Sequence, residues 1–248
     1  MYLSDVPNWI TTNFAGSQNM CQLAQALHRV VDEISPYVEA NFCSNHIKAR
    51  EVQDTAVHAK ALWEGLWHLH VLWCMRAHGL ELLNPATVGS NDDGIVVYDG
   101  QQIGLEVTFT NWGAPSDPLA STYRKRAFWE AEFNAVDQNI ADQIGKALAA
   151  KEYKLAQRQP RLPRLVALNE VLVTSGFPEW MTDTDGRRSM VVQSLEAQRL
   201  SGITGITYDY VGYGNFFKDS KLTLIPIGAG VDRYRGLAAI LREQVHRS

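Results

Sequence analysis

The stretch NDDGIVVYDGQQIGLEVTFTNWG, residues 91–113, contains two runs of strand-forming residues on either side of the dipeptide Asp99-Gly100. Asp-Gly is a favoured two-residue connection between antiparallel strands, so the stretch is predicted to form a β-hairpin. Two acids, Asp93 and Glu106, stand within or next to the expected strands. Because carboxylates oppose the burial that stabilises a strand, their presence needs a chemical explanation.

Counting outward from the turn sets Tyr98 opposite Gln101 and Asp93 opposite Glu106. A four-residue loop would instead set Asp93 opposite Thr108, and the two acids would still share a face. The other face of the hairpin is apolar and is expected to meet the core; it carries Val96, Tyr98, Ile103, Leu105, Val107 and Phe109. Facing carboxylates repel each other, whereas Mg²⁺ binds carboxylate oxygens together with water and substrate phosphate. The pattern therefore predicts a metal site at one end of the hairpin.

The composition is that of an ordinary globular protein: 248 residues, 46% hydrophobic, 20% charged, with a net charge of −4. A negative balance gives no overall basic signal, so a nucleic-acid site has to be a local patch. The three cysteines are widely spaced, which favours reduced thiols and a cytoplasmic location. The N-terminus lacks the pattern of a signal peptide, and the most apolar segment, residues 62–75, is too short and too polar to span a membrane.

Periodicity along the chain predicts an α/β fold, in which helices flank a mixed central β-sheet. A helical section is expected over residues 1–50, and an α/β core over residues 51–248, although the two could form one continuous domain. The helices are expected at residues 18–38, 51–78, 119–157, 189–200 and 232–245. Besides the hairpin, the strands are expected at residues 165–174, 203–211 and 222–227.

The hairpin motif resembles a known nuclease core. The segments D-G-I-V-V (residues 93–97) and I-G-L-E-V-T (residues 103–108) are similar to the metal-binding strands of the PD-(D/E)xK nuclease superfamily, which has the restriction-endonuclease-like fold. An apolar helix before the hairpin, and a helix and buried strand after it, extend the resemblance over residues 51–174. The resemblance implies that Asp93 and Glu106 bind the catalytic metal.

Two positions depart from the family pattern. Asp92 stands where the motif has proline, and Thr108 stands where it has lysine. Some members of the superfamily supply the missing lysine from the following helix, and here Lys151 shares the apolar stripe of the helix expected at 119–157. Lys151 is therefore the first candidate for this catalytic role, ahead of Lys146 and Gln143. The alternative is that Lys151 extends along the edge of the stripe to reach solvent.

Glu64 lies inside the apolar run of the helix expected at 51–78, where a lone carboxylate needs a partner. The resemblance implies that it is an additional metal ligand, together with the backbone carbonyl of Val107. The alternatives are a pairing with Arg76 or a histidine, and a place at the solvated edge of the helix.

The sequence thus predicts a Mg²⁺- or Mn²⁺-dependent nuclease that hydrolyses phosphodiester bonds, with DNA as the expected substrate. Basic clusters at residues 124–126 and 151–164 flank the site in sequence and could contact phosphates. Thr108 and the net charge leave a second hypothesis open, a catalytically inactive module of the same fold that binds nucleic acid or a protein partner. A third is an unrelated α/β domain whose hairpin acids are solvated. A homodimer and partner subunits of a larger complex both stay open.

Overall fold

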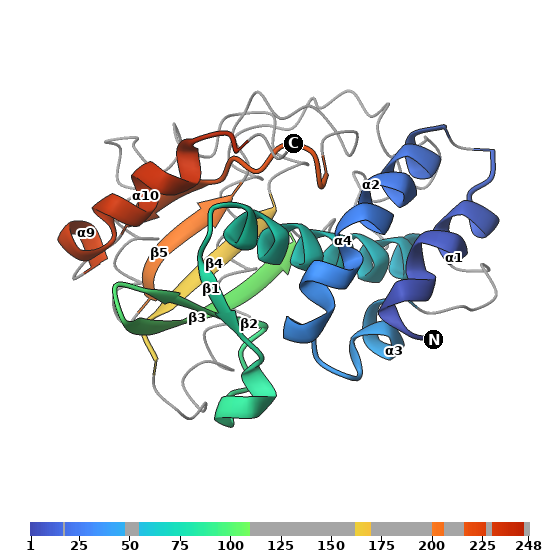
Figure 1. Ribbon diagram of the computed structural model, residues 1–248. Coiled ribbons are helices and arrows are strands. Elements are labelled where there is room, and N and C mark those ends of the chain that lie inside the picture. The colour runs from blue at the N-terminus through green and yellow to red at the C-terminus, as the bar shows by residue number, and fades with distance from the viewer. Residues whose placement is uncertain are drawn as a thin grey trace.

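The chain is an α/β protein built on one mixed β-sheet with helices packed against it, as the computed structural model shows (Figure 1). The structure describes residues 1–16, 18–47, 55–109, 162–169, 200–205, 216–226 and 230–245. Within the described residues, the sheet has six strands that lie side by side in chain order. They are β1 (Glu81–Leu83), β2 (Gly94–Tyr98), β3 (Gln101–Phe109), β4 (Arg164–Asn169), β5 (Leu200–Gly205) and β6 (Thr223–Pro226). Neighbouring strands are antiparallel except β3–β4 and β4–β5, which are parallel.

The N-terminal part of the chain is helical, as the sequence predicts. It comprises η1 (Leu3–Asp5), α1 (Val6–Asn13), α2 (Gln18–Ile34), η2 (Ser35–Tyr37) and α3 (Phe42–His46). Helix α2 ends at Ile34 rather than at residue 38, because Pro36 has no amide hydrogen to continue the helix. One continuous core joins buried side chains of this part, such as Val6 and Leu27, to those of the sheet.

Helix α4 (Thr55–Ala77) is the central helix, and it crosses the sheet on one face (Figure 1). It ends just before Gly79, whose φ of +76° suits glycine. Its apolar residues from Leu62 to Met75 are almost all buried, as their sequence predicts. Two of its side chains lie within hydrogen-bonding distance of backbone carbonyls elsewhere, Trp67 with Ala167 and His68 with Asp93, and so does that of His78, the residue after the helix, with Ser220. These contacts fix α4 to β4, to the residue before β2 and to the segment before β6.

The hairpin forms as predicted. Tyr98 pairs with Gln101, and both turn residues, Asp99 and Gly100, have positive φ values of 50° and 71°. Positive φ at both central positions is the requirement of a type I′ turn, whose twist matches that of the strands. The predicted core side chains Val96, Ile103, Leu105 and Val107 are buried in the main core, and Tyr98 packs partly buried against it.

Strands β4, β5 and β6 lie where the sequence predicts strands, and residues 170–174 and 206–211 of the expected strands lie outside the described residues. Strand β1 was not predicted, because three residues are too few to display an alternating pattern. Strand β5 begins at Leu200, which had been assigned to a helix, and β6 matches the expected strand closely. The helix expected at 119–157 lies outside the described residues, as does the one expected at 189–200 apart from Leu200. A short helix, η3 (Pro85–Val88), connects β1 to the loop before β2.

The C-terminal helices are α9 (Gly230–Arg233) and α10 (Arg235–Arg242). Leu237 and Leu241 of α10 join the same core as Leu72 of α4, so both helices cover one face of the sheet (Figure 1). Within the part of the chain that the structure describes, no helix is both long enough and apolar enough to cross a bilayer.

Candidate metal centre

The pairing of β2 with β3 becomes irregular at Asp93, the residue before β2. The ladder between β2 and β3 ends with Gly94 opposite Leu105, yet the Asp93 amide also donates to the Leu105 carbonyl at 2.9 Å. Two consecutive residues, Asp93 and Gly94, therefore lie opposite one residue of β3, Leu105, which is the arrangement of a β-bulge. The expected pairing of Asp93 directly opposite Glu106 is consequently not part of the ladder, because the bulge interrupts the alternation one residue before it.

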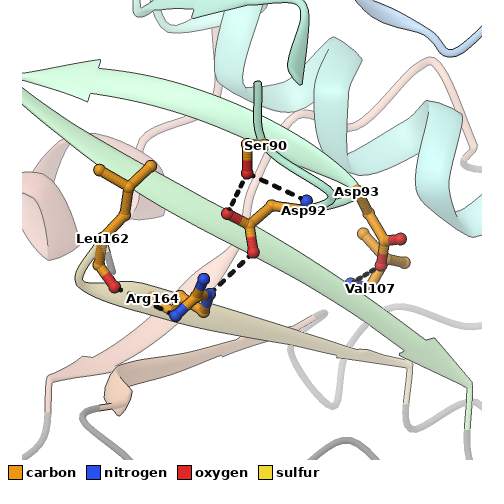
Figure 2. Close-up of polar contacts among 6 residues, drawn as sticks. All are labelled: Ser90, Asp92, Asp93, Val107, Leu162 and Arg164. Carbon is orange, nitrogen blue, oxygen red and sulfur yellow. Dashed lines mark hydrogen bonds and ion pairs between the residues drawn. The ribbon is translucent and has the colours of Figure 1, made fainter. Parts of the chain in front are cut away.

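The Asp93 carboxylate lies at the edge of β3, beyond the end of β2. Its Oδ2 accepts a hydrogen bond from the Val107 amide at 2.7 Å, and the side chain is half-buried (Figure 2). In an extended strand the N–H and C=O of one residue point toward the same neighbour. The Val107 carbonyl therefore points to the same edge, so a carboxylate and a backbone oxygen are available side by side.

Helix α4 approaches the same point. The Nε2 atom of His68 lies 2.6 Å from the Asp93 carbonyl oxygen. Glu64 precedes His68 by four residues, so it lies one turn earlier on the same side of the helix, and it is half-buried. This position is compatible with the metal-ligand role of Glu64, which stays a prediction beside the pairing with Arg76 or a histidine and the solvated edge of the helix.

A buried polar cluster that the sequence did not predict lies on the face of the sheet opposite to α4. Asp92 is fully buried; its Oδ1 accepts from Arg164 Nε at 2.7 Å and its Oδ2 from the Ser90 hydroxyl at 2.6 Å. Figure 2 shows that the neighbouring Asp92 and Asp93 side chains point in different directions. The only sequence signal was the unusual pair of adjacent acids, since Arg164 is 72 residues away.

Arg164 had been counted in the basic cluster at 151–164. In the structure only 4% of its surface is exposed, because the guanidinium pairs with Asp92 and donates to the Leu162 carbonyl at 3.4 Å. It is therefore part of the interior rather than of a phosphate-binding surface. The rest of that cluster, and the cluster at 124–126, lie outside the described residues.

Glu106 lies on the sheet face of the Asp92 cluster. A Cβ atom on Gly94 would contact Leu72 of α4, whereas one on Gly104 would contact Asp92, so these two glycines mark opposite faces. Alternation from Gly104 places Glu106 on the Asp92 face, and its side chain is fully buried. Thr108 lies in β3 opposite Leu168, its side chain is not described, and Lys151 is outside the described residues.

The donors near Asp93 suit a hard cation. They are oxygens: the half-buried Asp93 carboxylate and the Val107 carbonyl, with the half-buried Glu64 one turn from His68 on α4 as the candidate third ligand. Mg²⁺ is commonly held by one or two carboxylates plus waters and substrate phosphate, rather than by a complete protein cage. Among the described residues, no three histidine, cysteine, aspartate or glutamate side chains form a ready metal cluster. The residues thus fit an open site of the Mg²⁺ type and do not fit a closed structural one.

Comparison of the chain with family models, with curated proteins and with solved structures finds no match in any of the three. Only the residues and their arrangement therefore bear on the function.

Proposed function

We propose that this protein is a metal-dependent nuclease that hydrolyses phosphodiester bonds in DNA, built on a restriction-endonuclease-like core. One observation carries the proposal: the Asp93 carboxylate lies against Val107, inside the Glu106-Val107-Thr108 triplet of the neighbouring strand. The order of elements supports it, because the long helix α4 is followed by the antiparallel β1, β2 and β3, and then by a parallel β4.

The proposed metal ligands are Asp93, the Val107 carbonyl and Glu64. Glu106, which the resemblance adds to this set, is buried on the opposite face of the sheet with Asp92, so the proposed site does not include it. A bound Mg²⁺ or Mn²⁺ would lower the pKa of a coordinated water and neutralise charge on the scissile phosphate. The chain itself holds the acceptor oxygens at a fixed edge of β3, since the hydrogen bond from the Val107 amide orients the Asp93 carboxylate. Thr108 cannot supply the positive charge of the family's lysine, and we assign that role to Lys151.

A second candidate function also has support from the structure. Glu106 is fully buried, and Asp92 is engaged by Arg164 and Ser90. A protein that kept the nuclease fold but lost the lysine and buried an acid would bind nucleic acid or a partner without cutting. This inactive module differs from the enzyme in one measurable property, cleavage that requires a metal.

The test uses plasmid DNA with Mg²⁺ or Mn²⁺ and the variant Asp93→Asn. Asparagine retains an oxygen that can accept the Val107 amide, so the fold is expected to persist while the charge that binds metal is lost. The matched control is Asp99→Asn, which removes an exposed acid at the other end of the same hairpin. The proposal predicts metal-dependent cleavage in the wild type and in the control, and its loss in Asp93→Asn. Binding of DNA without cleavage by the wild type would favour the inactive module.

A further inference from the structure

His68 of α4 and His78, the residue after the end of α4, make the same kind of contact with different parts of the chain. The Nε2 atom of His68 lies 2.6 Å from the Asp93 carbonyl, and the Nε2 atom of His78 lies 3.0 Å from the Ser220 carbonyl. A carbonyl oxygen can only accept a hydrogen bond, so Nε2 carries the proton in both contacts and donates it. Only the first of these contacts reaches the candidate metal centre.

The His68 ring is held in place by its surroundings. Only 6% of the residue is exposed, and the Phe42 ring of α3 packs edge-on against it with 5.4 Å between ring centroids. The His46 ring lies on the same side, 6.5 Å from His68. Such packing fixes the direction in which the Nε2–H bond points, so the contact with Asp93 is built into the fold.

Asp93 needs such an anchor because it lies at the bulge. Past Gly94 no regular ladder pair fixes its backbone, which is bonded to β3 through the amide and to α4 through the carbonyl. A shift of this backbone would move the carboxylate away from Val107, and it would change the distance to Glu64 on the same side of α4. A catalytic or metal-binding group that is misplaced by about 1 Å loses much of its effect.

We infer that His68 is a positioning residue for the metal centre: by donating to the Asp93 carbonyl it sets where the Asp93 carboxylate stands relative to Val107 and to Glu64. The inference rests on the proposed function, since it assigns the His68 contact to the same metal site. His68 acts through Asp93 and does not itself bind the metal.

The experiment measures the affinity of the full-length protein for Mn²⁺ alone by isothermal titration calorimetry, with no nucleic acid present. Four variants are compared with the wild type: His68→Leu, His68→Gln, His68→Asn and His78→Leu. Glutamine places an amide donor near the position of Nε2, whereas asparagine places it near Nδ1, too far back to reach the carbonyl. His78→Leu is the matched control, because it removes the equivalent contact, made just after the end of the same helix, with a carbonyl outside the site.

We expect the Mn²⁺ dissociation constant to rise about 10- to 100-fold in His68→Leu and His68→Asn, the range typical of residues that orient metal ligands. His68→Gln should recover most of the wild-type affinity, and His78→Leu should keep all of it, whatever either variant does to stability. Should His68→Leu not fold, the comparison of the two polar variants carries the test. Equal affinity in His68→Gln and His68→Asn, or an equal loss in His78→Leu, overturns the inference while the nuclease proposal stands. A wild type that binds no Mn²⁺ overturns both, and that outcome is recognised before any variant is made.

Discussion

The guanidinium of Arg164 donates to the Asp92 carboxylate at 2.7 Å, and this ion pair joins the start of β4 to the loop before β2. The side chains of both partners are almost entirely buried, with 5% and 0% of their surfaces exposed. Asp92 is the neighbour of Asp93, so the pair fixes the chain immediately before the candidate metal centre. A buried charge requires a partner, which makes the two residues strongly dependent on each other.

Removing both partners of this pair should therefore cost clearly less free energy of unfolding than the two single removals added together. We expect Asp92→Asn and Arg164→Met each to lower the free energy of unfolding by about 3–5 kcal/mol, because each leaves a buried charge uncompensated. The double variant should lose clearly less than the sum of the two. Urea unfolding of the four proteins measures this coupling, and strictly additive losses would contradict it. Asp232→Asn, which breaks an exposed pair with Arg235, is the control and should change stability little.

The Asp92–Arg164 pair leaves no room for a side chain at Gly104. A Cβ atom added there would lie 2.7 Å from the Asp92 Oδ2 atom and 3.2 Å from the Arg164 Cγ atom. Gly104→Ala should thus push the carboxylate out of its hydrogen bonds and lower the free energy of unfolding by about 1–3 kcal/mol. Gly16→Ala is the matched control, since a Cβ atom there meets no atom within 4 Å. Equal unfolding free energies for the two alanine variants would show that the cluster adapts freely.

The hairpin could be predicted from the sequence because its determinants are local. Asp99-Gly100 sets the turn, and alternation from the turn sets which side chains reach the core. The bulge at Asp93 could not be predicted, since one extra residue leaves no mark on an apolar pattern that has already ended. This is why Asp92, rather than Asp93, shares the sheet face of Glu106. The partner of Asp92 could not be predicted either, because parallel pairing of β3 with β4 brings Arg164 beside Gly104 from a distant part of the chain.

His70 makes stability depend on pH. The ring is fully buried and stacks on Phe216 with 4.7 Å between centroids, and burial lowers the pKa of His70 from 6.5 to about 3. The Phe217 amide donates to its Nδ1 at 3.2 Å, so the neutral ring carries its proton on Nε2, which lies 3.4 Å from Cys74 Sγ. Below pH 6.5 His70 is protonated in the unfolded chain but stays neutral in the folded chain. The free energy of unfolding therefore falls as the pH drops toward 3.

This group alone should remove up to about 1.4 kcal/mol of unfolding free energy per pH unit in that window. Urea unfolding between pH 7 and 4.5 measures the slope. His70→Asn retains an acceptor for the Phe217 amide and should give a flatter profile, though from a lower starting stability. His28→Asn replaces an exposed histidine and should leave the slope unchanged. Parallel profiles for the wild type and His70→Asn would refute the assignment to His70.

Metal binding should itself be visible as stabilisation. A cation that binds only the folded chain raises the free energy of unfolding by about 2.7 kcal/mol at a concentration 100 times its dissociation constant. We expect Mn²⁺ to raise the Tm of the wild type, EDTA to reverse the rise, and Asp93→Asn to abolish it, because the charge at the edge of β3 is lost. Asp99→Asn should respond as the wild type does. If Mn²⁺ raised the Tm of Asp93→Asn by the same amount, the cation would be binding elsewhere, and Asp93 would serve only to bond the Val107 amide beyond the end of β2.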